Sequence, residues 1–335
     1  MINRNRFLNI DQFVIDPDRE YLKLCEKLGG SVIKFGAKQI INIFDIRETV
    51  LEEGESFLRN KISKLNIFFS LIFENISDEE KSLLEEKIIK CYAQKNITED
   101  NESLYDIEEK SILSRKKFKS VEKMPTFLDL YNLLKLDKKL KKFAIILKPY
   151  ISGSMKYLNN VTNVDVKNKL IVVDINEVSE NEIPIVMFII TDFFWDIIKK
   201  DRTKQKILYL DEVWKMINKN EYTAEFVFKL FKTIRRYGGA ATAITQDISD
   251  FFMLDDGKYG KGILNNSSIK TLFQLEENDL NILESVIRLS EEEKIRLINM
   301  PRGTAIIHAG RNALMVDVIS SEKEHQFINT DLINH

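Results

Sequence analysis

Residues 207–216 read Ile207-Leu-Tyr-Leu-Asp-Glu-Val-Trp-Lys-Met216, and this stretch decides the expected fold. Its first four side chains are uncharged and largely apolar, and two adjacent carboxylates, Asp211 and Glu212, follow them. A short apolar run of this kind predicts a strand buried inside a sheet. We therefore expect both carboxylates at the carboxyl end of that strand, where its backbone leaves the sheet.

Further strands and helices are expected on both sides of this stretch. After the stretch Asp16-Pro-Asp-Arg-Glu20, a helix should run through Leu28 and end at Gly29-Gly30, and others should cover about 183–200 and 224–236. Strands that alternate with helices predict an α/β fold with a mostly parallel sheet and right-handed crossovers. The other expected strands are residues 12–16, 31–34, 40–44, 170–175, 240–245, 271–275, 304–308 and 313–319.

Residues 52–147 have a different character. They are rich in Lys, Glu, Leu and Phe at helical spacing, have no glycine after Gly54, and are interrupted by the polar stretch 96–106. We predict three parts: a first core part (1–51), an all-helical insertion (52–147) on the rim of the sheet, and a second core part (148–335).

The Asp-Glu pair has two interpretations. In P-loop NTPases, a strand ends on an Asp that holds the shell of a magnesium ion and a Glu that polarises the attacking water. Asp211, reaching Mg²⁺ through water, and Glu212 are candidates for these roles. A buried strand that merely ends at an acidic turn explains the same residues, because Asp-Glu pairs are common.

Polar residues near the next expected strand add to this picture. Gln246 follows residues 240–245, where a RecA-type ATPase places a sensor of the γ-phosphate, and an amide can both donate to phosphate and accept from water. Its alternative is a solvated amide at a strand end. Arg235 and Arg236 are candidates for an arginine finger that serves a neighbouring subunit, or for a basic helix end that complements the helix dipole.

No phosphate-binding loop of the form G-x-x-x-x-G-K-[ST] occurs in these 335 residues. The nearest approach, Ser152-Gly-Ser-Met-Lys156, lacks the first glycine, the Gly-Lys pair and the following Ser or Thr. The carboxylates alone should hold magnesium-nucleotide weakly, because no cradle of backbone N–H groups and no lysine reaches the phosphates.

Composition excludes several other classes. Hydrophobic residues make up 44% and charged residues 30%, which is typical of a globular protein, and the formal net charge is only −2. No global field therefore favours nucleic acid or anionic membrane. Cys25 and Cys91 stand apart, which predicts reduced cytosolic thiols. The N-terminus has no secretory h-region, and the longest apolar runs, 64–73 and 183–195, are too short to span a bilayer.

Six segments together resemble the ATPase domain of conjugative-transfer and type IV secretion ATPases of the VirB/TraE/TraC kind, in order and spacing over essentially the whole chain. They are Asp11-Gln-Phe-Val-Ile-Asp-Pro-Asp-Arg-Glu-Tyr21, Leu28-Gly-Gly30, Ile41-Asn-Ile-Phe-Asp45, Ile207-Leu-Tyr-Leu-Asp-Glu-Val-Trp214, Ile234-Arg-Arg-Tyr-Gly-Gly239 and Thr245-Gln246.

The resemblance implies a RecA-like motor domain that uses ATP and Mg²⁺ and assembles into a hexameric ring. The ring would lie on the cytoplasmic side of the cell membrane, held there by membrane-embedded channel components, with relaxase or DNA as a possible substrate. It also implies that Asp211 and Glu212 are the Walker B pair, Gln246 the sensor, and one of Arg235 and Arg236 the trans-acting arginine. Asp16 and Glu20 match a second acidic motif beside the nucleotide. A helix N-cap followed by a first-turn acid explains them equally well.

In that family the phosphate loop and its strand precede the segment that begins here, and residues 1–7 resemble the tail of the helix that the loop opens. We therefore expect a truncated form that hydrolyses no ATP alone and exposes unpaired backbone where a strand is missing. Two alternatives remain open. One is a non-catalytic assembly subunit, and the other is a DNA-pumping relative of the coupling proteins and the FtsK/HerA group.

Overall fold

The computed structural model describes residues 1–36, 38–73, 75–108, 115–246 and 248–328. Its centre is a parallel sheet in the order β2-β5-β1-β6-β7. Four of its strands lie where the sequence predicted them, and β7 is shorter than expected. The strands are β2 (Ser31–Lys34), β5 (Leu170–Asp174), β1 (Asp11–Asp16), β6 (Lys206–Leu210) and β7 (Gly239–Ala243).

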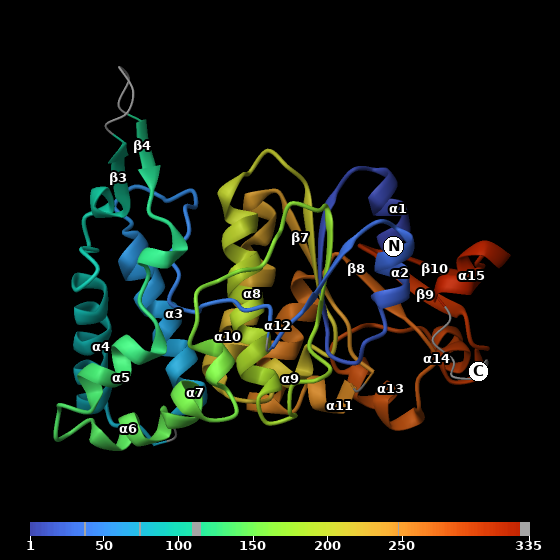
Figure 1. Cartoon of the computed structure of the whole chain (residues 1–335). Helices are drawn as coiled ribbons and strands as arrows, with labels where there is room; N and C mark the ends of the chain where they lie inside the picture. The colour runs from blue at the N-terminus through green and yellow to red at the C-terminus, as the bar shows by residue number, and fades with distance from the viewer. Residues whose placement is uncertain (37, 74, 109–114, 247, 329–335) are drawn as a thin grey trace.

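Helices cover both faces of this sheet, which is why the middle residues of its central strands are mostly apolar. In β1, Phe13 and Ile15 face the helix α8 (Ile183–Lys200), and Phe13 stacks on Phe194 with the ring centroids 4.6 Å apart. Val14 points the other way, into a smaller cluster with Cys25 of α2 (Leu22–Lys27). Figure 1 shows α1 and α2 on one side of the sheet and α8 to α10 on the other.

The remaining core helices surround these layers or follow them along the chain. They are α1 (Ile2–Phe7), α9 (Trp214–Ile217), α10 (Glu221–Thr233), α11 (Ile248–Phe251), α12 (Lys258–Asn266), α13 (Glu277–Glu284), α14 (Glu291–Asn299) and α15 (Glu322–Ile328). Short 3-10 turns link some of them, namely η4 (Ile234–Tyr237) and η5 (Leu254–Gly257).

The last three strands form a separate antiparallel sheet in the order β10-β9-β8. Its strands are β8 (Ile269–Leu272), β9 (Thr304–Ala309) and β10 (Asn312–Asp317). Among the described strands, β7 pairs only with β6, so its other edge has no partner in that part of the chain.

The predicted strand at 40–44 is wrong. This segment is buried but joins no ladder, because side chains of a distant loop bind its backbone. The N–H of Ile40 donates to Asn163 Oδ1 at 2.8 Å, and the N–H of Asn42 donates to Thr162 Oγ1 at 2.7 Å. A β-like apolar run that finds side-chain partners needs no neighbouring strand to satisfy its backbone.

The insertion is helical except for one antiparallel hairpin, which corrects the all-helical expectation. The hairpin strands are β3 (Tyr105–Glu108) and β4 (Arg115–Phe118). The helices are α3 (Phe57–Ile72), α4 (Asp78–Ala93), α5 (Phe127–Leu134) and α6 (Lys141–Ile146), with the 3-10 turns η1 (Asn101–Leu104) and η2 (Val121–Lys123). The helix α7 (Lys148–Ser152) and the 3-10 turn η3 (Lys156–Leu158) follow directly after residue 147. The insertion lies outside the helix layer of α8 and α10 instead of on the rim of the sheet (Figure 1). The predicted domain limits at 51/52 and 147/148 stay predictions.

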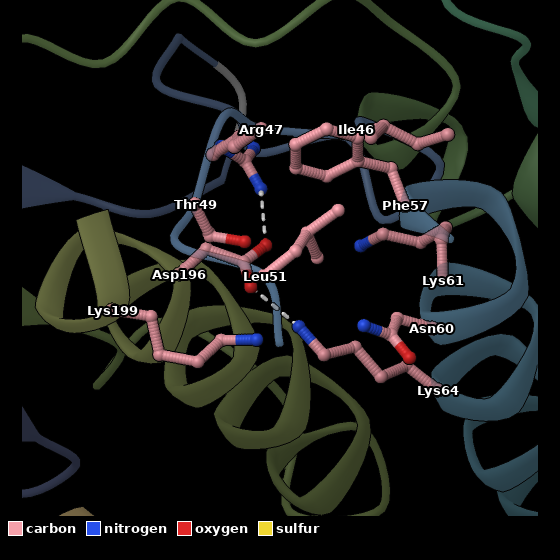
Figure 2. A pocket seen from close by; sticks show the side chains of 10 residues that line it. All are labelled: Ile46, Arg47, Thr49, Leu51, Phe57, Asn60, Lys61, Lys64, Asp196 and Lys199. Carbon is pink, nitrogen blue, oxygen red and sulfur yellow. Dashed lines mark hydrogen bonds and ion pairs between the residues drawn. The ribbon is translucent and has the colours of Figure 1, made fainter. Parts of the chain in front are cut away.

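A buried group of charges joins the insertion to the core. Lys61 and Lys64 project from α3, and Asp192 and Asp196 project from α8. Lys61 Nζ lies 2.8 Å from Asp192 Oδ2, and Lys64 Nζ contacts Asp192 and lies 2.5 Å from Asp196 Oδ1. Figure 2 shows Lys64, Asp196 and the nearby Arg47 around a small cavity between the two helices. We call Lys61, Lys64, Asp192 and Asp196 the α3–α8 charge cluster.

No helix among the described residues combines the length and the apolar character that crossing a bilayer requires.

Candidate functional site

The carboxyl ends of the parallel strands bring acidic side chains to one edge of the sheet. Asp174 ends β5, Asp16 ends β1, and Asp211 and Glu212 follow β6. Because β5, β1 and β6 are consecutive neighbours, these side chains share one edge. Asp16 and Asp211, both candidates from sequence, therefore lie at the ends of neighbouring strands.

Asp211 is buried and carries a strongly shifted pKa. Its Oδ1 accepts the backbone N–H of Glu212 at 3.1 Å, while its own N–H donates to Ile15 O of β1. Burial, and then the charge of Glu212, raise the pKa of Asp211 to about 7. Burial and the charge of Asp211 also raise the pKa of the neighbouring Tyr21. A buried carboxylate with this pKa would be stabilised in its charged form by a nearby cation.

Glu212 is held in an unusual conformation by a tryptophan. Its φ is +46°, in the left-handed region that non-glycine residues seldom adopt. The indole Nε1–H of Trp214 donates to Glu212 Oε2. Burial raises the pKa of Glu212, and the bond from Trp214 opposes this rise. The backbone at Glu212 therefore bends so that its carboxylate reaches the indole.

Replacing Trp214 with phenylalanine tests this hydrogen bond. The ring remains, but Glu212 loses the donor on its buried carboxylate, so we expect the free energy of unfolding to fall by about 1–3 kcal/mol. In a Glu212→Ala background the same change should cost much less, and chemical denaturation of the four proteins gives the coupling energy. Trp195→Phe serves as the control tryptophan. Equal losses in both backgrounds would show that the bond adds nothing.

The end of β7 is tied to β6 just beyond the two carboxylates. The N–H of Ile244 donates to Leu210 O at 3.0 Å, and the N–H of Val213 donates to Ile244 O at 3.2 Å. Gln246 follows three residues after the strand and is exposed. It is therefore at the same edge as Asp211 and Glu212, and among the described residues no hydrogen bond joins it to either carboxylate.

Asp16 and Glu20 differ in burial, and the Asp16 side chain has a structural role. Both oxygens of Asp16 accept backbone N–H groups, from Glu20 and from Tyr21, each at 2.9 Å. Asp16 thus closes the turn before α2, and burial raises its pKa. Glu20 is exposed. The helix-cap interpretation is wrong, because α2 begins at Leu22 with Tyr21 as its N-cap residue, no side chain caps it, and its first turn contains no acid. A nucleotide-binding role of both residues stays a prediction.

Arg235 and Arg236 lie at the opposite end of β7 from Gln246. Both are exposed in η4, before the strand begins. The turn into β7 requires Gly238, whose φ is +70° and where a Cβ would stand 2.7 Å from Arg202 O. A strand of this length separates the arginines from the acidic edge by roughly 15 Å. They cannot serve the acidic edge of their own chain in this arrangement, which leaves the neighbouring-subunit role as a prediction.

Three residues of this edge were missed from sequence. Asp174 ends a strand that was itself predicted, and its Oδ2 accepts from Arg19 Nε at 2.9 Å. Tyr21 and Trp214 both stand inside quoted motifs. For Trp214, the available signal was its spacing from Glu212. A Trp two residues after a Glu can donate its indole N–H to that carboxylate only where the backbone between them makes a tight turn.

The donor set fits magnesium only through water and phosphate. Within the described ranges, no group of three or more His, Cys, Asp or Glu side chains is placed to hold a metal ion. Mg²⁺ commonly binds one or two carboxylates and completes its shell with water and substrate phosphates. Asp211 and Glu212 fit that requirement, with Asp211 as the residue that would hold the ion.

A parallel sheet flanked by helices, with an Asp-Glu pair at the end of an inner strand, defines a P-loop NTPase type of fold. The chain belongs to the TraG P-loop domain family, whose model matches residues 5–316. The resemblance predicted from the six motifs is therefore confirmed, and the fold is that of a conjugative-transfer and type IV secretion ATPase domain.

Solved structures agree with this assignment. VirB4 of Thermoanaerobacter pseudethanolicus is 27% identical with a TM-score of 0.84, and the match covers 97% of this chain and 86% of that one. The conjugative coupling protein TrwB is similar in fold alone. Its unbound form is 13% identical with a TM-score of 0.52, covering 95% and 88%. Its complex with the ATP analogue ADPNP is 14% identical with a TM-score of 0.51, covering 95% and 87%. No curated protein matches the chain.

Proposed function

We propose that this chain is the motor portion of a type IV secretion ATPase that energises channel or pilus assembly and substrate transfer. The observation that carries the proposal is the Asp211-Glu212 pair, buried at the acidic edge beside β7. The match to VirB4, at higher identity and TM-score than the match to TrwB, favours the secretion ATPases over the DNA-pumping coupling proteins.

In this proposal, each residue of the acidic edge has a separate task. Asp211 would hold Mg²⁺ through water, and Glu212 would orient the attacking water and accept its proton. Gln246 senses the γ-phosphate, and Asp16 keeps the turn before α2 in place beside the nucleotide. When bound, magnesium neutralises negative charge on the phosphates. A basic side chain from a neighbouring subunit, Arg235 or Arg236, completes the charge balance.

The assembly that follows from this task is a ring, hexameric in the secretion ATPases that the chain resembles. A trans-acting arginine requires a neighbouring subunit at the acidic edge, so activity depends on the ring. We place the ring at the inner face of the cell membrane, in contact with membrane-embedded channel components. ATP and Mg²⁺ are the proposed cofactors.

The purified chain of residues 1–335 is expected to bind ATP poorly and to hydrolyse it negligibly, since it has no Gly-Lys-[ST] loop to cradle the phosphates. Steady-state phosphate release with Mg²⁺ and ATP measures this. A saturable rate that Glu212→Gln abolishes would contradict the expectation.

The motor itself is tested by extending the chain at its N-terminus with a strand, a G-x-x-x-x-G-K-S loop and a helix that runs into α1. We expect this extended chain to gain ATPase activity and Glu212→Gln to lower its kcat by about a hundredfold or more. The control is Glu26→Gln on the exposed side of α2, which should leave kcat unchanged. An extended chain that is folded and binds ATP, yet hydrolyses none, would instead support a non-catalytic assembly subunit.

A further inference from the structure

The face formed by the exposed residues of the segment 135–149 has an unusual composition. Every lysine in this segment is exposed: Lys135, Lys138, Lys139, Lys141, Lys142 and Lys148. Between them stand three exposed aliphatic side chains, Leu136, Ile145 and Ile146, with exposed fractions of 79%, 57% and 38%. Asp137 is the segment's only acid, and it is half-buried. We call this surface the lysine face.

The lysine face has a fixed shape, because other side chains of the same segment are buried and hold it against the core. Leu140, Phe143 and Leu147 are buried in the main core, and Phe143 packs against Phe73 with ring centroids 4.6 Å apart. The exposure of the aliphatic residues is therefore not the result of a poorly packed segment. They project from a packed one, and α6 holds Lys141 and Ile145 on neighbouring turns.

Most of the positive charge on this face is uncompensated. Lys139 and Lys142 pair with Glu79 and Glu80 of α4 at 2.5 and 2.7 Å, and Asp137 pairs with Lys87 at 2.8 Å. Within the described part of the chain, the other four lysines of the face have no carboxylate partner: Lys135, Lys138, Lys141 and Lys148. A chain of almost zero net charge thus concentrates free positive charge at one place.

We propose that the lysine face binds directly to the surface of an anionic lipid bilayer. Ammonium groups attract acidic lipid headgroups, and the exposed aliphatic side chains enter the boundary between headgroups and acyl chains. Lysine stems add apolar contact while their charged ends stay in water. The helix α6 of this face lies at the end of the insertion away from the β3–β4 hairpin (Figure 1).

The composition argues against the other occupants of a basic surface. Protein interfaces are enriched in aromatic residues and Arg and depleted in Lys, whereas every cation of this face is a lysine and no aromatic side chain on it is exposed. Single-stranded nucleic acid needs aromatic platforms for its bases, and the face has none. Lysines interleaved with aliphatic residues are instead suited to a bilayer surface.

Co-sedimentation of the full chain with vesicles tests the proposal. We expect binding to vesicles of phosphatidylcholine mixed with phosphatidylglycerol, little binding to phosphatidylcholine alone, and weaker binding as salt rises. The variant Lys135→Glu/Lys138→Glu/Lys141→Glu/Lys148→Glu should bind at least about tenfold more weakly, since each lysine near an anionic surface strengthens binding several-fold. Leu136→Ser/Ile145→Ser should also weaken binding, although the charge is unchanged.

A matched control reverses four exposed lysines of the core part, Lys23, Lys27, Lys38 and Lys323, and should bind like the unaltered chain. Circular dichroism confirms that each variant is folded. Three results would overturn the proposal: no binding to anionic vesicles, equal binding to both kinds of vesicle, or equal loss in the control. Binding of duplex DNA or of an acidic protein through this face, without vesicle binding, would do the same.

Discussion

Replacing Asp211 with asparagine should raise the free energy of unfolding at pH 8 by about 2–4 kcal/mol. The pKa of Asp211 is about 7 in the folded chain and about 4 in the unfolded one. The folded state therefore binds more protons between these values, and stability falls as pH rises from about 4 to about 7. Asparagine cannot ionise, so the variant escapes this loss.

Denaturant unfolding of both proteins between pH 4 and pH 8 measures the effect. The two curves should approach each other near pH 4, where Asp211 is protonated in the folded state and about half protonated in the unfolded one, and separate as the pH approaches 7. Asp165→Asn is the control, because that exposed residue should change stability by less than about 0.5 kcal/mol. A constant difference at every pH would mean that the carboxylate does not titrate as its burial requires.

Replacing Asp192 with alanine should destabilise the chain by about 3–5 kcal/mol. Asp192 is the common partner of Lys61 and Lys64 in the α3–α8 charge cluster, so its loss leaves buried ammonium groups with less counter-charge. Burial alone would raise the pKa of Asp192, but these two lysines lower it below its usual range. The stabilisation from the ionised carboxylate is therefore present at neutral pH and disappears only in acid, below the usual pKa of an Asp.

The matched control for this change is an exposed ion pair. Asp78→Ala removes the partner of Lys81 at the start of α4, where Asp78 is 98% exposed, and should cost well under about 1 kcal/mol. The double variant Lys61→Met/Asp192→Asn should recover part of the loss, since one buried cation leaves with the carboxylate. If Asp192→Ala were no worse than Asp78→Ala, the cluster would not hold the insertion to the core.

The parallel sheet could be predicted because its signals are local. In β1, β5 and β6 an apolar run ends on an acid, and this combination marks both the strand and its carboxyl end. Asp211 and Glu212 followed directly from it. The segment 40–44 has the same apolar character, yet Asn163 and Thr162, more than a hundred residues away, satisfy its backbone. Contacts between residues so far apart in the sequence cannot be predicted from a pattern of a few neighbouring residues.

The details of the acidic edge depend on conformation that residue types do not specify. A left-handed φ is rare for glutamate and no residue type specifies it, so neither this conformation of Glu212 nor its bond to Trp214 was predicted. The β3–β4 hairpin was missed because Arg115-Lys-Lys-Phe118 has no apolar alternation. The position of Arg235 was readable, since residues before a parallel strand must lie at its amino end.

One edge of β7 has no partner among the described strands, and a strand that paired there would make the stability of this chain depend on that strand's concentration. β7 is built from Gly239, Thr242 and three alanines, so its side chains are too short to keep another backbone away. Any strand that pairs there binds the folded chain and not the unfolded one. By mass action, the midpoint of unfolding then rises with the amount of that strand, whichever molecule carries it.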